Sequence, residues 1–239
     1  MNKRKLNVAS LMINLTVLIL TAYSVAHNFR TDVIREIEWF DFSGFLCLRY
    51  FTNLSNIFSA VAAAIILVFN VKNVINDEYV FPKWAITVKY VSACAVAVTF
   101  VTVTVFLTPM VALNGKSFFL LFKGNSFFVH FLNPLLAIIN IILFERTPAL
   151  SFKNAAIGVI PTLIYSVVYV VLVVGFKIWP DFYNFTFNGT YWALPIVIAC
   201  MYGMAFGLAA AIYALRKKAT AKLYEKSAVS DENTEKTNG

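Results

Sequence analysis

Six long apolar runs, separated by short polar segments, set the pattern of this chain. The runs cover residues 6–27, 48–71, 84–108, 126–144, 154–176 and 191–215. Each is close to the ~20 residues that an α-helix needs to cross a bilayer, where a helix satisfies its own backbone hydrogen bonds. The pattern predicts an all-α, polytopic membrane protein in which residues 1–215 form one domain of six transmembrane helices.

The two ends of the chain differ from the apolar runs between them. The first run is too long for the apolar region of a signal peptide and has no obvious small-residue cleavage site, so we expect a retained helix. After residue 215 the sequence becomes basic and then polar, ending in SDENTEKTNG. Such a composition cannot bury a core, and it predicts a disordered cytoplasmic tail over residues 216–239.

Lys and Arg fall unevenly on the two sides of the predicted bundle. Twelve lie in the N-terminus, the second and fourth loops and the start of the tail: Lys3, Arg4, Lys5, Lys72, Lys83, Arg146, Lys153, Arg216, Lys217, Lys218, Lys222 and Lys226. Five lie on the other side: Arg30, Arg35, Lys116, Lys123 and Lys177. Because loops rich in Lys and Arg stay in the cytoplasm, both termini are predicted to be cytoplasmic.

A cluster of polar residues opens the second apolar run, in the sequence LRYFTNLSNIFS at 48–59. Helical spacing places Arg49, Thr52, Ser55, Asn56 and Ser59 on one face. In lipid, an unpaired polar group costs roughly 1–3 kcal/mol, so we expect this stripe to face other helices or a wet cavity. Hydrogen-bonded contact between helices is the alternative interpretation.

The fourth run carries a second polar stripe, with His130, Asn133 and Asn140 at helical spacing. Pro134 removes a backbone hydrogen bond and can kink this helix beside His130. Helices two and four run in the same direction, and Thr52 and His130 each lie about four residues, or roughly 6 Å, into their helices. A hydroxyl and an imidazole at one depth suit nucleophilic acyl transfer, although a packing contact between two helices is also consistent with the spacing. We expect helices two and four to be neighbours, with the Thr52 hydroxyl about 2.6–3.2 Å from a His130 ring nitrogen or bridged to it by one water.

The composition limits the chemistry that the chain can perform. Hydrophobic residues make up 60% of it and charged residues 13%, against an apolar share of roughly 45–50% in soluble domains. The net charge of +8 comes from Lys and Arg between the apolar runs, which is a topology signal and not a nucleic-acid-binding surface. Two His and three scattered Cys offer no metal-ligand spacing, and no nucleotide-binding motif is present, so no metal, cofactor or nucleic acid is expected.

Other polar and aromatic positions give weaker expectations. The outer loops at 32–42, 116–124 and 178–192 are aromatic and predict a lid or collar at the membrane surface, or simple anchoring. Glu145 and Arg146 are expected to be a solvated pair at the end of helix four. On helix five, a polar set at helical spacing is expected to line the same cavity or a seam between helices: Thr162, Tyr165, Ser166 and Tyr169. On helix six, a ridge of small residues is expected to serve helix packing or a homodimer: Ala199, Gly203, Gly207 and Ala211.

Three segments carry a resemblance to a known family: RYFTNLSN at 49–56, VHFLNPLLAIINIILFE at 129–145 and WPDFYNF at 179–185. With the six predicted helices, they resemble the androgen-induced-gene and ADTRP family of membrane threonine hydrolases, and most closely its bacterial relatives, over roughly residues 6–215. The resemblance implies hydrolysis of lipid esters, notably fatty acid esters of hydroxy fatty acids. It also implies that Thr52 is the nucleophile and His130 the base.

The leading hypothesis is therefore a lipid ester hydrolase, with its lipid substrate entering from the outer leaflet of a bacterial plasma membrane. Ser55, Asn56 and Asn133 are candidate donors to the developing oxyanion, and Arg49, Ser59 and Asn140 are candidate cavity-lining residues. A hydroxyl, an amide, or an acid of the first loop (Glu36, Glu38 or Asp41) would orient the imidazole. The rival is a protein that binds or transports a lipid or small molecule through a polar-lined passage.

The predicted orientation has a direct test in intact cells. A protease site inserted near Asn114, in the second outer loop, should be cut by protease added outside, because the Lys and Arg distribution places this loop outside. A C-terminal tag should be protected. Cleavage of that tag in unbroken cells would contradict the assignment.

Overall fold

The computed structural model describes residues 3–28, 44–187 and 189–237, with side chains described up to residue 222. Within these ranges the chain is all-helical, without strands. Six helices are long and apolar enough to cross a membrane: Lys3–Asn28, Phe51–Ile75, Lys83–Leu113, Asn125–Phe144, Lys153–Gly175 and Tyr191–Lys222. The prediction of six spanning helices is confirmed.

The first three spans are nearly continuous helices. They comprise α1 (Lys3–Asn28), a 3-10 turn η1 (Gly44–Arg49), α2 (Phe51–Ile75), and α3 (Lys83–Thr102), which continues through the π-turn η2 (Val103–Leu107) into α4 (Thr108–Leu113). Arg49 lies in η1, one residue before Tyr50, whose extended backbone precedes α2. The predicted place of Arg49 on the helical stripe is therefore wrong, because Arg49 lies before the start of α2.

The last three spans are interrupted more often. After the 3-10 turn η3 (Leu120–Phe122), the fourth span consists of α5 (Asn125–Phe127), the π-turn η4 (Phe128–Leu132), α6 (Asn133–Ile139) and the π-turn η5 (Asn140–Phe144). The fifth comprises α7 (Lys153–Ile157), α8 (Ile160–Val170) and the π-turn η6 (Val171–Gly175), and the sixth η7 (Tyr191–Ala193) and α9 (Leu194–Thr237). A proline lies two residues after each of η2 and η4, at Pro109 and Pro134. Because proline has no N–H to donate, the regular helical hydrogen bond is lost there and a π-turn precedes it.

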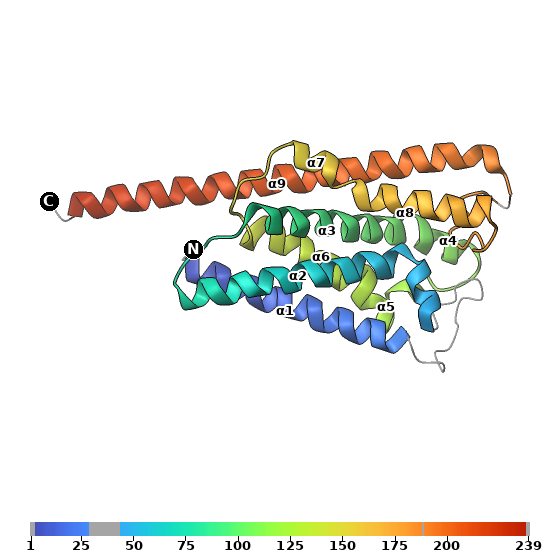
Figure 1. Cartoon of the computed structure of the whole chain (residues 1–239), viewed down its shortest axis with the longest axis horizontal. Helices are drawn as coiled ribbons and strands as arrows, with labels where there is room; N and C mark the ends of the chain where they lie inside the picture. Colours follow the sequence, from blue (N-terminus) through green and yellow to red (C-terminus); the bar gives the residue numbers. More distant parts are fainter. Residues whose placement is uncertain (1–2, 29–43, 188, 238–239) are drawn as a thin grey trace.

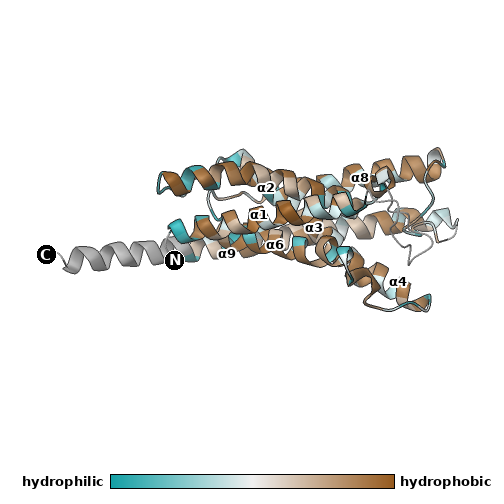
Figure 2. Ribbon diagram, turned by 90° about the horizontal axis from the view of Figure 1, so that it is seen from below, coloured by the Kyte–Doolittle hydropathy of each residue, from teal (hydrophilic) through white to brown (hydrophobic). Residues whose placement is uncertain are grey.

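The spans lie side by side, and the start of α1 and the end of α9 reach the same end of the bundle (Figure 1). Apolar residues run along the lengths of the helices, with hydrophilic residues gathered toward their ends (Figure 2). Many large apolar side chains face outward, among them Leu163, Ile164 and Val167 of α8. Such an exterior is expected of a protein whose surroundings are lipid.

The first helix buries its polar face and exposes its apolar one. Its buried polar residues are spaced by three, four or seven positions and therefore share one face: Asn7, Ser10, Asn14, Thr21, Ser24 and Asn28. This arrangement is the reverse of a soluble amphipathic helix, and it follows from the bilayer, where polar groups find partners only inside the bundle.

The polar face of α1 meets a buried carboxylate, that of Glu145. Oε1 of Glu145 accepts hydrogen bonds from Asn14 Nδ2 and Asn140 Nδ2, both at 2.8 Å, and lies 3.0 Å from the Ser10 hydroxyl. Lys89 of α3 donates to Asn14 Oδ1 at 2.7 Å. The Glu145 side chain is fully buried, so its expected place in a solvated surface pair is wrong: the polar faces of three other helices converge on it.

The backbone beside Glu145 is fixed by two further side chains. Arg216 of α9 donates to the Glu145 carbonyl at 2.7 Å and to the Pro148 carbonyl at 2.9 Å. Tyr79, in the loop between α2 and α3, accepts a hydrogen bond from the Arg146 N–H at 3.0 Å. Burial raises the pKa of Tyr79 to about 12, so its hydroxyl stays protonated and donates to the Phe144 carbonyl.

The sixth span departs from the sequence prediction at its end. Arg216 and Thr220 are buried, and the Thr220 hydroxyl donates to the Arg146 carbonyl at 3.2 Å. The packed part of the bundle therefore extends past residue 215. The backbone of α9 stays helical to Thr237, over residues predicted to be disordered, because residues 216–237 lack Gly and Pro and are rich in helix-forming Ala, Lys and Glu.

The small-residue ridge of α9 is not a seam within the chain. Ala199, Gly203, Gly207 and Ala211 are all exposed. The close helix contact lies instead at Gly158, where a Cβ atom would meet the Ala209 Cβ at 2.9 Å and the Cys94 Sγ at 3.0 Å. The homodimer through the ridge stays a prediction.

The buried charges at Glu145 and Lys89 give a prediction on stability. Lys89→Met should lower the free energy of unfolding by roughly 3–5 kcal/mol, because it removes the buried cation that Asn14 links to the Glu145 carboxylate. Adding Glu145→Gln should recover much of this loss. Thermal unfolding in detergent measures both, with Lys83→Met, at the exposed start of α3, as control. Equal midpoints for the two single lysine variants would contradict the prediction.

Candidate functional site

A cavity lies between α2, α3, α8 and α9, beneath the loop after η6. Most of its wall is apolar, and none of its lining residues carries a charge. Its polar members are hydroxyl-bearing: Thr52, Thr99, Thr102, Thr162, Tyr165, Ser166, Tyr169 and Tyr183. The predicted stripe of helix five therefore lines a cavity. An apolar wall with few polar groups is typical of a site for a lipid or another apolar ligand.

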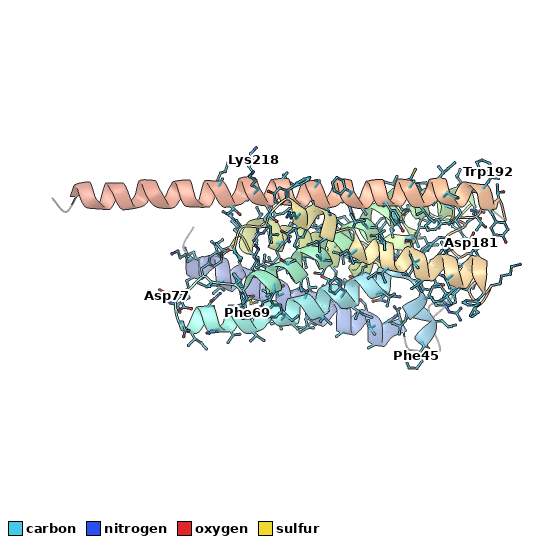
Figure 3. The ribbon with its side chains drawn as sticks, turned by 45° about the horizontal axis from the view of Figure 1, so that its top comes forward. Phe45, Phe69, Asp77, Asp181, Trp192 and Lys218 are labelled. Atoms are coloured by element: carbon cyan, nitrogen blue, oxygen red, sulfur yellow. The ribbon has the colours of Figure 1, made fainter. Side chains whose placement is uncertain are left out.

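The loop after η6 covers this cavity at the end of the bundle away from the termini, where Asp181 and Trp192 lie (Figure 3). The Asp181 carboxylate accepts hydrogen bonds from the backbone N–H groups of Phe185 and Thr186, at 3.0 and 2.8 Å, and from the Tyr169 hydroxyl. The Tyr183 hydroxyl accepts a bond from the Phe51 N–H at 3.1 Å. These bonds hold the aromatic loop against the start of α2.

Thr52 stands on the cavity wall in the first turn of α2. Its side chain is largely buried, and its hydroxyl has no hydrogen bond with any other described residue. Its backbone carbonyl accepts bonds from Ser55 Oγ at 3.0 Å and Asn56 Nδ2 at 2.8 Å. Thr52 is therefore the one member of the predicted stripe that presents an unengaged hydroxyl to the cavity.

His130 is buried in η4, and a backbone carbonyl fixes its ring. Nδ1 lies 2.6 Å from the Leu121 carbonyl oxygen. Because a carbonyl only accepts, Nδ1 carries the hydrogen, and Nε2 of the neutral ring keeps its lone pair. The group that orients the imidazole is thus the backbone near η3. The acids Glu36, Glu38 and Asp41, and the aromatic segment 32–42, lie outside the described residues.

The hydrogen bond expected between Thr52 and His130 is not formed. Between these two described residues no bond joins the hydroxyl to the ring, and His130 does not line the cavity. Their helices are neighbours, as predicted, but the connection runs through Asn56, whose Nδ2 donates to both the Thr52 carbonyl and the Val129 carbonyl at 2.8 and 2.9 Å. Thr52 and the residue before His130 are therefore joined by one amide.

Pro134 explains why the Val129 carbonyl is open to Asn56. In η4 the Asn133 N–H reaches back five residues to the Phe128 carbonyl. The next bond of this register would join the Val129 carbonyl to the N–H of residue 134, and proline has none. The Asn56 side chain supplies the missing donor.

The other predicted site residues lie between helices and not on the cavity wall. Asn133 Nδ2 donates to Thr21 Oγ1 at 3.1 Å and to Asn56 Oδ1 at 3.2 Å, so the N–H groups of both amides are used. Ser55 Oγ lies 2.8 Å from Thr99 Oγ1. These bonds leave Ser55, Asn56 and Asn133 poorly placed as oxyanion donors. They act as contacts between helices, which is the alternative that the spacing had left open.

Three more predicted positions, Ser59, Asn140 and Arg49, do not line the cavity. Ser59 is fully buried with no partner for its hydroxyl among the described residues. Asn140 belongs to the hydrogen bonds around Glu145. The Arg49 carbonyl accepts a bond from the Tyr165 hydroxyl at 2.6 Å, which ties η1 to α8.

Two sets of polar residues escaped the sequence analysis. One is the buried face of α1, whose spacing of three, four or seven residues was visible in the sequence. The other is the pair Thr99 and Thr102 of α3, which are one turn apart and both line the cavity. Threonines are common in apolar helices, and only the neighbouring stripe of α2 would have singled them out. The described residues contain no group of three His, Cys, Asp or Glu side chains that could hold a metal ion.

Asn56 offers a test of this arrangement. Asn56→Leu removes the donor to two carbonyls and the acceptor for Asn133, and it should lower the free energy of unfolding by about 1–3 kcal/mol. Asn114→Leu is the matched control, since Asn114 makes a similar bond to the Met110 carbonyl at an exposed position. The thermal midpoints of the two variants in detergent decide the matter. A midpoint for Asn56→Leu no lower than that of the control would contradict the conclusion that the Asn56 amide holds α2 against η4.

Comparison with protein families, with characterised proteins and with solved structures finds no match for this chain.

Proposed function

We propose that this chain is a membrane-embedded lipid ester hydrolase in which Thr52 is the nucleophile and His130 the base. The observation that carries the proposal is the unengaged hydroxyl of Thr52 on the wall of an apolar cavity. A long acyl chain fits such a wall, and its ester group would then lie among hydroxyls. The resemblance to the androgen-induced-gene and ADTRP family supports the same two residues.

The reaction would proceed through an acyl-enzyme. Thr52 Oγ attacks the ester carbonyl carbon, the carbonyl π pair moves onto oxygen, and the hydroxyl proton passes to His130 Nε2. Collapse of the adduct breaks the bond to the alcohol, which leaves with that proton. Water then attacks the acyl group, giving a proton to His130, and release of the fatty acid returns the proton to Thr52.

The fixed tautomer of His130 supports its role as base. With the hydrogen on Nδ1 held by the Leu121 carbonyl, the lone pair on Nε2 is available. Proton transfer requires Nε2 within about 2.6–3.2 Å of the Thr52 oxygen, and such bonds often tighten only in the substrate complex. The proposal therefore requires a movement of η4 or of the first turn of α2 that brings these two atoms together.

The cavity favours a neutral, largely apolar ester. Its lining residues include no charge that would bind an ionised headgroup. Among lipid esters, the resemblance favours fatty acid esters of hydroxy fatty acids. From the Lys and Arg distribution we propose that the cavity lies at the outer leaflet, with both termini in the cytoplasm, and that the host membrane is a bacterial plasma membrane.

One observation favours a second function, binding or transport of an apolar molecule. The described residues contain no hydrogen bond between Thr52 and His130, and a binding protein needs none. In that case the same cavity would hold the ligand without cleaving it.

Substitution at the two residues separates these functions. Thr52→Ala and His130→Ala should each lower ester turnover by at least about 10²-fold, and the double variant little further, because groups that act as a unit are not additive. Thr52→Ser should keep some activity, since it retains the oxygen. Initial rates of long-chain ester hydrolysis by purified protein measure this.

Ser166→Ala is the control, because Ser166 lines the same cavity while its hydroxyl is bonded to Tyr202. It should retain near wild-type turnover. Undiminished hydrolysis by a folded Thr52→Ala variant would refute the nucleophile. Wild-type protein that cleaves no long-chain ester would favour the binding function.

A further inference from the structure

A hydrogen bond between α2 and α3 fixes how these antiparallel helices are aligned. Ser55 Oγ of α2 lies 2.8 Å from Thr99 Oγ1 of α3. Moving three residues toward the start of α2 leads from Ser55 to Thr52, and moving three residues toward the end of α3 leads from Thr99 to Thr102. Both steps rise about 4.5 Å in the same direction. Thr52 and Thr102 are therefore level with each other, and both line the cavity.

The hydroxyl of Thr102 is shielded from solvent and has no hydrogen-bond partner among the described residues. A helical threonine can bond to the carbonyl four residues earlier, as Thr104 does to the Phe100 carbonyl at 2.7 Å. Thr102 makes no such bond. A buried donor of this kind is rare unless a ligand or water completes it.

The other hydroxyls of the cavity wall are already engaged or lie elsewhere. The Thr99 hydroxyl is paired with Ser55, that of Tyr165 with the Arg49 carbonyl, and that of Ser166 with Tyr202. Besides Thr52 and Thr102, the described lining residue whose hydroxyl has no partner is Thr162.

Thr162 lies at a different depth from Thr102. Gly158 lies between α7 and α8, and its close contact with Cys94 aligns the fifth span with α3, which runs in the same direction. Four residues further along each helix bring Thr162 level with Val98. That level is about 6 Å, or one turn, short of Thr102. Thr102 is thus the unengaged donor at the level of the nucleophile.

We propose that the Thr102 hydroxyl donates a hydrogen bond to the carbonyl oxygen of the ester that Thr52 attacks. This inference rests on the proposed function. As Thr52 adds to the carbonyl carbon, negative charge develops on that oxygen, and a donor in an apolar cavity stabilises this charge more than it stabilises the neutral ester. Thr102 takes the place of the amides that the sequence had suggested, since their N–H groups are used between helices.

Thr102→Val is the decisive variant, because it keeps the shape of the side chain and removes the hydroxyl. With the 4-nitrophenyl ester of octanoic acid as probe, we expect kcat to fall about 10²–10³-fold, as for the loss of one oxyanion donor. KM should change little, because the bond strengthens mainly in the transition state. The thermal midpoint should not fall, since the lost hydroxyl has no partner in the free protein. Thr102→Ser should restore most of the rate.

Thr108→Val is the matched control, as it removes an equally buried and unpartnered hydroxyl at the start of α4 that does not line the cavity, and it should keep near wild-type kcat. Wild-type kcat in Thr102→Val, with turnover still dependent on Thr52, would overturn this inference alone. A wild-type protein that cleaves no ester would overturn it together with the proposed function. If Thr102→Val does not fold, Thr102→Ala and Thr102→Ser are compared: a gap of about 10²-fold supports the donor, and equal rates refute it.

Discussion

The buried carboxylate of Glu145 is the interaction on which the arrangement of the helices depends. Side chains of α1 and η5 donate to it directly, α3 reaches it through Lys89 and Asn14, and α9 bonds the carbonyl of the same residue through Arg216. Hydrocarbon offers no partner to any of these groups, so each must be matched inside the bundle. The inward polar face of α1 is a consequence of this constraint.

The two ends of the bundle treat polar groups differently. Near Glu145 the donor groups of Asn14, Asn140, Lys89 and Ser10 are used in mutual hydrogen bonds, whereas Glu145 Oε2 and Asn140 Oδ1 have no partner among the described residues. Around the cavity at the other end, hydroxyls of α2, α3 and α8 are left without partners in an apolar wall. Donors that are used at one end hold the helices together, and hydroxyls that are free at the other end are available to a ligand.

The sequence predicts the six spans, and it predicts that helices two and four lie next to each other, because hydropathy and helical spacing are local properties. The burial of Glu145 could not be read in this way, since it depends on faces of three other helices. The relation of Thr52 to His130 failed for a different reason. The π-turn before Pro134 adds a residue to its turn, and one residue rotates a helix by about 100°, so equal depth did not bring the ring to the hydroxyl.

Mapping of a covalent adduct tests the role of Thr52 most directly. Purified protein is treated with a long-chain fluorophosphonate, digested and analysed by mass spectrometry. Thr52 as nucleophile predicts the adduct on the peptide that contains residue 52, with its loss in Thr52→Ala and slower formation in His130→Ala. An adduct on another hydroxyl of the cavity, such as Thr102, Thr162 or Ser166, would contradict it, as would ester hydrolysis that continues while Thr52 stays unmodified.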